Sequence, residues 1–172
     1  LQTHHSAIRW AIAGRSLSKL KSVREQLGNA ELPMIEADSG SAADMARLAG
    51  TARVIISTVG PYAQHGTKLL EACAAEGTHY CDLTGEPQWM AAVFEKVSDM
   101  AEESGARLVH CCGFDSIPSD LGVFVAQKIM HERHGVYATH VSGRMGPSKG
   151  AVSGGTVASM LLAMEQGVND PI

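Results

Sequence analysis

Residues 4–20, HHSAIRWAIAGRSLSKL, decide the fold because they run from a strand directly into a helix. Residues 8–13 are apolar apart from Arg9, Gly14-Arg15-Ser16 makes a turn, and Leu17 begins a helical face. In nucleotide-binding α/β domains the second strand ends in this way, next to the adenosine ribose. Only seven residues precede this strand, so the first strand and the glycine-rich phosphate loop of such a domain are not found ahead of it.

Composition narrows the class of protein. The chain has 172 residues, is 45% hydrophobic and carries a formal net charge of −4. Its Lys and Arg residues are scattered along the sequence and form no basic cluster of the kind that binds nucleic acid. No apolar run approaches the roughly 20 residues of a membrane helix, and the polar start without Met is not a signal peptide. We expect a cytoplasmic chain with no nucleic-acid partner and no integral membrane segment, whose true start lies upstream.

The four cysteines indicate reduced thiols rather than a metal centre. Cys73, Cys81, Cys111 and Cys112 form no CxxC pair, and small buried thiols are common in cytosolic proteins. An alternative is a metal site built from Cys81, Cys111 and the neighbouring histidines His79 and His110. That spacing matches no standard zinc pattern, so we predict no metal.

Strand and helix patterns alternate along the chain, with glycine between them, which predicts a doubly wound parallel sheet of Rossmann type without its first strand. The apolar run at 52–59 is typical of a strand buried on both faces. Strands are predicted at 8–13, 33–36, 53–59, 79–82 and 106–111, and helices at 16–27, 42–49, 64–76, 87–104 and around Leu121, Val125 and Ile129.

The pattern changes near residue 136. Residues 136–145 alternate like a strand open on one face, a Gly/Ser-rich segment follows, and one more helix is predicted at 156–166. We therefore divide the chain into a partial nucleotide-binding domain, 1–135, and the beginning of a second α+β domain, 136–172.

The turn after the first predicted strand favours NADP. Domains that prefer NAD place an acidic residue at this position for the ribose hydroxyls. Here the chain has Arg15, with Ser16 and Lys19 close behind, and no carboxylate. A guanidinium matches a phosphate with paired donors, so these residues are candidates for the 2′-phosphate. The alternative is an ordinary solvated helix start.

The loop after the strand at 53–59 is the second candidate. In a doubly wound sheet, ligands bind beyond the carboxyl ends of the strands. Gly60 permits a close backbone approach, Pro61 fixes the turn, and Tyr62 and His65 offer a phenol and an imidazole as proton donors. The alternative is that Gly-Pro only ends a strand.

Carboxylates follow the last two predicted strands. Asp115 and Asp120 follow the strand at 106–111 and are candidates for orienting a substrate or for acid–base chemistry. Asp120 is equally a helix cap. After the strand at 79–82, the segment with Asp82, Thr84 and Glu86 is explained mostly by the start of the next helix.

Three ordered segments resemble the saccharopine dehydrogenase-like oxidoreductases, including the trans-acting enoyl reductase branch. They are AGRSLSKL (13–20), STVGPYAQHGTKLLEACAAEGTHYCDLTGE (57–86) and GFDSIPSDLG (113–122), with fainter similarity in GAVSGGTVASML (150–161). The resemblance implies that Arg15 and Ser16 face the cofactor adenosine. It further implies that Ser57, Thr58, Gly60 and Pro61 line the ribose and nicotinamide, with Gly113, Phe114, Asp115, Pro118 and Asp120 beside the nicotinamide and substrate.

The family resemblance implies an NADP-dependent oxidoreductase that moves hydride between nicotinamide and a C=N, C=C or carbonyl group, with Tyr62, His65 and Asp115 as candidate proton donors. It also implies a chain more than twice as long, so we expect a fragment that is inactive alone and prone to self-association. Two alternatives stay open. One is a non-catalytic Rossmann-type scaffold for a protein or lipid partner, and the other is a nucleotide-sugar or ester enzyme on the same fold.

Overall fold

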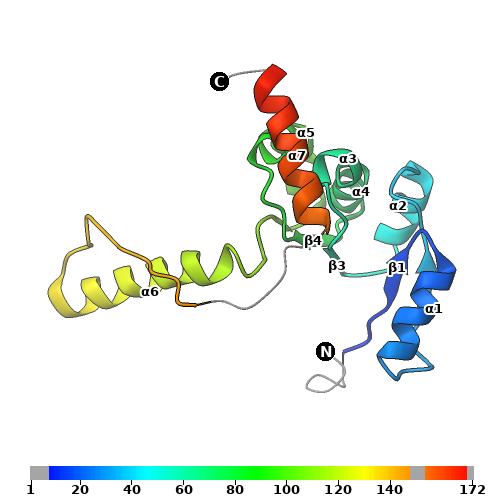
Figure 1. Ribbon diagram of the computed structural model, residues 1–172, viewed down its shortest axis with the longest axis horizontal. Coiled ribbons are helices and arrows are strands. Elements are labelled where there is room, and N and C mark those ends of the chain that lie inside the picture. Colours follow the sequence, from blue (N-terminus) through cyan, green and yellow to red (C-terminus); the bar gives the residue numbers. More distant parts are fainter. Residues whose placement is uncertain (1–7, 148–153, 170–172) are drawn as a thin grey trace.

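The computed structural model describes residues 8–147 and helix 154–169. Helices alternate with strands that all pair in parallel, which confirms the predicted fold class (Figure 1). In chain order the elements are β1 (Ile12–Gly14), α1 (Leu17–Gln26), β2 (Met34–Glu36), α2 (Ala42–Ala49), β3 (Val54–Ser57), α3 (Tyr62–His65), α4 (Thr67–Glu76), β4 (His79–Asp82), α5 (Pro87–Ser104), β5 (Leu108–Val109), α6 (Ile117–His134) and α7 (Gly154–Asn169).

The strands form two separate ladders. β1 pairs with β2, and β3, β4 and β5 form the second ladder in that order. Within the described residues no ladder joins β1 to β3, in agreement with a sheet that lacks its central first strand. The strands are shorter than the sequence predicts because a residue without a strand neighbour makes no ladder hydrogen bonds.

Local sequence signals set most helix ends. Ser16 Oγ accepts from the backbone N–H of Lys19 at 3.4 Å, and Ser41 Oγ accepts from that of Asp44 at 3.2 Å. Side-chain caps of this kind satisfy N–H groups that have no partner inside the helix. Gly77, with φ of 71°, ends α4 in the left-handed conformation that glycine adopts at little cost.

One hydrophobic core joins α2, α4 and α5 to the second ladder. The predicted stripe on α5 is buried: Trp89, Val93 and Val97 are at most 6% exposed. Leu70 and Cys73 of α4 are fully buried against it. This packing holds the carboxyl ends of β3 and β4 in place beneath the α3–α4 helices.

The opposite face of the sheet is open, so the expectation that 52–59 is buried on both sides is wrong. Val54 is 52% exposed and Ile56 is 64% exposed, because no described helix covers them. α6 contains no buried residue and projects away from both ladders (Figure 1). Its predicted stripe of Leu121, Val125 and Ile129 is exposed.

The strand predicted at 136–145 is also wrong, because this segment has no strand beside it. The backbone of Ala138 hydrogen-bonds to the Gln127 side chain in place of a neighbouring strand. Gln127 Nε2 donates to Ala138 O at 2.9 Å, and Gln127 Oε1 accepts from Ala138 N at 2.8 Å. The helix predicted at 156–166 is present as α7, and residues 148–153 lie outside the described part of the chain. None of the described helices is long and apolar enough to cross a membrane.

Candidate functional site

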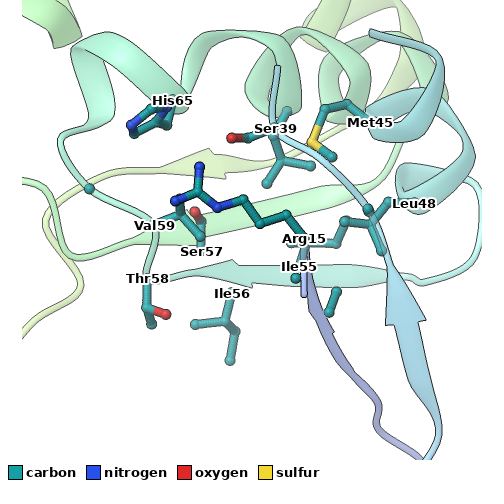
Figure 2. Close-up of a pocket in the computed structure, with 15 residues that line it drawn as sticks. Arg15, Ser39, Met45, Leu48, Ile55, Ile56, Ser57, Thr58, Val59 and His65 are labelled. Atoms are coloured by element: carbon teal, nitrogen blue, oxygen red, sulfur yellow. The ribbon is translucent and has the colours of Figure 1, made fainter. Parts of the chain in front are cut away.

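A cavity of about 330 Å³ lies between the carboxyl end of β1 and the second ladder (Figure 2). Met45 and Leu48 of α2 and Leu69 of α4 give it an apolar wall. Its polar lining comes from Arg15, Ser39, Ser57, Thr58 and His65, and Gly60 lies at its edge. The cavity therefore lies in the crevice where a doubly wound sheet binds its ligand.

Arg15 is the cationic group of this cavity. It directly follows β1, whose end is fixed to β2 by the bond from Ala37 N to Gly14 O at 3.1 Å. The side chain extends across the cavity toward the loop after β3 (Figure 2). No described residue forms an ion pair with it. Its guanidinium is thus available to an anionic ligand, whereas Ser16 caps α1 and Lys19 does not line the cavity.

Ser57 has a buried hydroxyl without a hydrogen-bond partner. The residue is 4% exposed and lines the cavity, and no described group hydrogen-bonds its Oγ. Leaving a buried hydroxyl unpaired costs about 1–3 kcal/mol. A ligand hydroxyl or phosphate oxygen in the cavity would remove that cost.

The two side chains predicted after Gly60 have different surroundings. His65 lines the cavity from α3. Tyr62 is buried, stacks on Trp89 with ring centroids 5.5 Å apart, and donates its hydroxyl to Ser57 O at 3.0 Å. Burial, the largest influence, raises the pKa of Tyr62, so the phenol stays protonated. In this arrangement Tyr62 holds the loop, and His65 alone of the pair faces the cavity.

The residues predicted from the 113–122 segment are not brought to the cavity. A Cβ at position 113 would lie 2.9 Å from the Leu83 Cβ, so Gly113 leaves room for Leu83, and Phe114 is 73% exposed. Asp115 is exposed in the loop before α6. Pro61 is buried behind the cavity wall. The roles predicted for these residues stay predictions.

Two residues that the sequence did not single out as a pair lie together at the ends of β4 and β5. His110 Nδ1 lies 2.7 Å from Asp82 Oδ2, and Asp82 is 1% exposed. Sequence reasoning assigned Asp82 to a helix start and His110 to a rejected metal site. The available signal was their position, because Asp82 ends β4 and His110 directly follows β5, its parallel neighbour.

The cysteines agree with the prediction of free thiols. All four are unpaired, and no group of side chains among residues 8–147 and 154–169 is arranged to hold a metal ion. Burial raises the pKa of Cys73 to about 12, which keeps this core thiol protonated and inert.

Comparison with known proteins fits this geometry. Residues 1–110 match the family model of the saccharopine dehydrogenase NADP-binding domain. The chain belongs to this family. NADP is therefore the cofactor of the domain, as Arg15 and the absence of an acidic residue beside it predicted.

The chain is also similar in sequence to trans-acting enoyl reductases of mycobacteria. The chain is 42% identical over 165 residues to "Putative trans-acting enoyl reductase Rv2449c" of Mycobacterium tuberculosis, covering 95% of this chain and 39% of the relative. It is 40% identical over 174 residues to the trans-acting enoyl reductase of Mycobacterium leprae, covering 99% and 42%. It thus spans about two fifths of the length of these curated relatives.

The fold itself is shared with a solved structure. Apo histidine-tagged saccharopine dehydrogenase (L-Glu forming) from Saccharomyces cerevisiae superposes with a TM-score of 0.56 at 15% identity, over 73% of this chain and 25% of that one. At this identity the likeness concerns the fold alone.

The cavity fits the adenosine end of NADP. Arg15 places a cation at the cavity, which suits a phosphate group, and Ser57 places an unpaired buried hydroxyl there. Part of the N–H groups at the helix N-termini already have acceptors: Ser16 accepts one in α1, Ser41 accepts one in α2, and Glu86 accepts two in α3.

Proposed function

We propose that this chain is the nucleotide-binding part of an NADP-dependent reductase acting on a C=C bond conjugated to a carbonyl group. The observation that carries the proposal is the cavity in which Arg15 and the unpaired Ser57 hydroxyl meet, in a domain of an NADP-binding family. The names of the mycobacterial relatives favour an enoyl substrate over the C=N and carbonyl alternatives.

Each side chain of the cavity has a task in this proposal. Arg15 binds the 2′-phosphate and selects NADPH, Ser57 and Thr58 orient the ribose, and Gly60 lets the nicotinamide side approach the backbone. When bound, NADPH supplies the hydride. The protein contributes orientation and a proton, as is usual for cofactor enzymes.

The test uses a chain of the relatives' full length with one substrate of each class. An enoyl thioester (the N-acetylcysteamine thioester of crotonic acid), an imine formed from a 2-oxo acid and an amine, and a simple ketone are offered with NADPH, and loss of NADPH fluorescence is followed. We expect turnover of the thioester. Turnover of only the imine or ketone would replace the substrate class, and NADPH binding without any turnover would support a non-catalytic scaffold.

A further inference from the structure

The buried carboxylate of Asp82 is surrounded by hydrogen-bond donors. Its Oδ1 accepts from the backbone N–H of Thr84 and of Cys111, both at 3.1 Å. Its Oδ2 faces the Tyr80 hydroxyl at 3.0 Å and His110 Nδ1 at 2.7 Å. Cys111 makes its contact from a left-handed backbone conformation, with φ of 58°, that non-glycine residues rarely adopt. The loop after β5 is therefore shaped around Asp82.

These contacts decide the protonation of the pair. Burial raises the pKa of Asp82, but the hydrogen bonds from His110, Thr84 and Tyr80 together hold that pKa below its ordinary value. Asp82 is therefore ionised and has no proton to give. The hydrogen between Asp82 Oδ2 and His110 must then be on Nδ1, and the neutral ring leaves Nε2 without a hydrogen.

The ring is fixed, and its other nitrogen is open. The Trp89 ring packs edge-on against His110 with centroids 5.1 Å apart, and Tyr80 does so at 6.1 Å. The His110 side chain is 21% exposed. No described residue is found in a hydrogen bond with Nε2. An imidazole held by a carboxylate on one nitrogen and open on the other is a standard arrangement for proton transfer.

Asp82 and His110 lie at the same carboxyl edge of the β3–β4–β5 ladder as Ser57, which lines the cofactor cavity. Ser57 is the register partner of Asp82, and Cys81 is the partner of Val109, which directly precedes His110. Strands lie about 4.8 Å apart, so His110 follows a strand about 10 Å from that of Ser57. Tyr62 stacks on Trp89, which contacts His110, so the aromatic row links this ring to the loop after β3.

His65, the imidazole predicted from the sequence, lacks such support. It lines the cavity, but no described residue hydrogen-bonds to its ring. Among the described residues its ring thus lacks the carboxylate and aromatic contacts that hold His110.

We propose that His110 donates the proton of the reduction and that Asp82 is its positioning residue, an inference that rests on the proposed function. Reduction of a C=C bond adds a hydride to one carbon and a proton to the other. NADPH provides the hydride and becomes NADP⁺. The imidazolium of His110 releases its Nε2 proton to the second carbon and becomes neutral, and solvent at its exposed edge returns a proton. Asp82 stays ionised throughout.

The first test determines the tautomer of His110 without any substrate turnover. Long-range ¹H–¹⁵N NMR on the wild-type chain distinguishes the two neutral tautomers, and we expect the hydrogen of His110 on Nδ1. In Asp82→Asn this preference should be lost, whereas His79→Gln, at the other end of β4, should leave it unchanged. A wild-type ring with its hydrogen on Nε2 would overturn the pairing.

The second test reads proton donation in a chain of full length with NADPH and the crotonyl thioester. His110→Asn keeps a donor toward Asp82 but has no transferable proton, so kcat should fall about 100-fold or more while NADPH affinity is kept. Asp82→Asn should also lower kcat while NADPH affinity is kept, because the ring loses the carboxylate that fixes its orientation. The ring is in contact with Asp82 and Tyr80 from β4 and with Trp89 from α5.

The outcomes separate the two proposals. A wild-type kcat and pH profile in His110→Asn would overturn proton donation while the reductase stands. A wild-type protein that turns over no substrate would overturn the reductase and the proton role together, and the NMR result would still decide whether Asp82 and His110 form the pair.

Discussion

The backbone N–H of Tyr62 donates to Glu86 Oε1 at 2.9 Å, across 24 residues of chain. The other oxygen of Glu86 accepts from Ala63 N at 2.8 Å, and Ser159 of α7 donates to Oε1 at 2.8 Å. One buried carboxylate thus caps α3, fixes the loop of the cofactor cavity and holds α7. A negative charge at a helix N-terminus is also favoured by the helix dipole.

Replacing Glu86 with Ala should destabilise the fold. Two N–H groups would lose their acceptor, and each unpaired buried donor costs about 1–3 kcal/mol. Urea unfolding followed by circular dichroism measures the loss. Glu76→Ala, an exposed position at the end of α4, is the matched control and should change little. Equal stability of the two variants would show that the cap contributes nothing.

Arg15→Glu should weaken NADPH binding far more than NADH binding. A charged hydrogen bond contributes about 1.5–3 kcal/mol, so we expect about a 10- to 100-fold loss for NADPH. Fluorescence titration of both cofactors at one salt concentration, in a chain of full length, gives the ratio. Arg9→Glu, an exposed change outside the cavity lining, is the control for net charge. An equal loss for both cofactors would remove the 2′-phosphate role.

Asp82 should make the stability of the fold sensitive to acid. Its pKa is lower in the folded chain than its ordinary value of 3.8, so the ionised form stabilises the fold at neutral pH. That stabilisation is lost as the pH falls below 3.8 toward the folded-state value. Asp82→Asn should therefore be less stable than wild type at neutral pH, and the difference should shrink in acid. Denaturant titrations across this pH range measure it, with the exposed Asp99→Asn as control.

The 172-residue chain should bind NADP weakly and self-associate. In the proposed site Arg15 and Ser57 hold one end of the nucleotide, but Ser16, Ser41 and Glu86 already occupy N–H groups at the helix N-termini, which leaves fewer donors for a pyrophosphate. Within the described residues, β1 and β3 each have one edge without a strand partner, which invites pairing with another chain. Calorimetry and sedimentation test the two statements. Micromolar binding by a monomer would show that a phosphate site exists that we have not recognised.

Much of this fold follows from local patterns in the sequence. Apolar runs ended by Gly predict the five strands, and Ser16, Ser41 and Gly77 predict helix ends, because these signals act within a few residues. The helix predicted at 64–76 instead starts at Tyr62 and is interrupted at Gly66. Both differences come from distant residues: Glu86 caps Tyr62, and a Cβ at Gly66 would lie 2.8 Å from Trp89.

The candidate site shows the same division. Arg15, Ser57 and Gly60 were predicted at a cavity because strand ends converge in this fold class, and the structure brings them together. The Asp82–His110 contact spans 28 residues and depends on the β4–β5 register, which no local pattern contains. The face of β3 that is open to solvent was equally invisible, because an apolar run carries no sign of whether a helix will cover it.

The separation of the two ladders has a mechanical consequence for the cofactor. Arg15 directly follows β1 of the β1–β2 ladder, and Ser57 ends β3 of the β3–β4–β5 ladder. No strand pairing among residues 8–147 and 154–169 holds the two ladders at a fixed spacing. Their spacing depends on the side chains through which α2 packs on α4, among them Met45, Leu48 and Leu70. Nucleotide affinity is thereby tied to helix packing, so we expect a small change of volume at Leu70, which is buried and does not line the cavity, to alter binding at the proposed 2′-phosphate site.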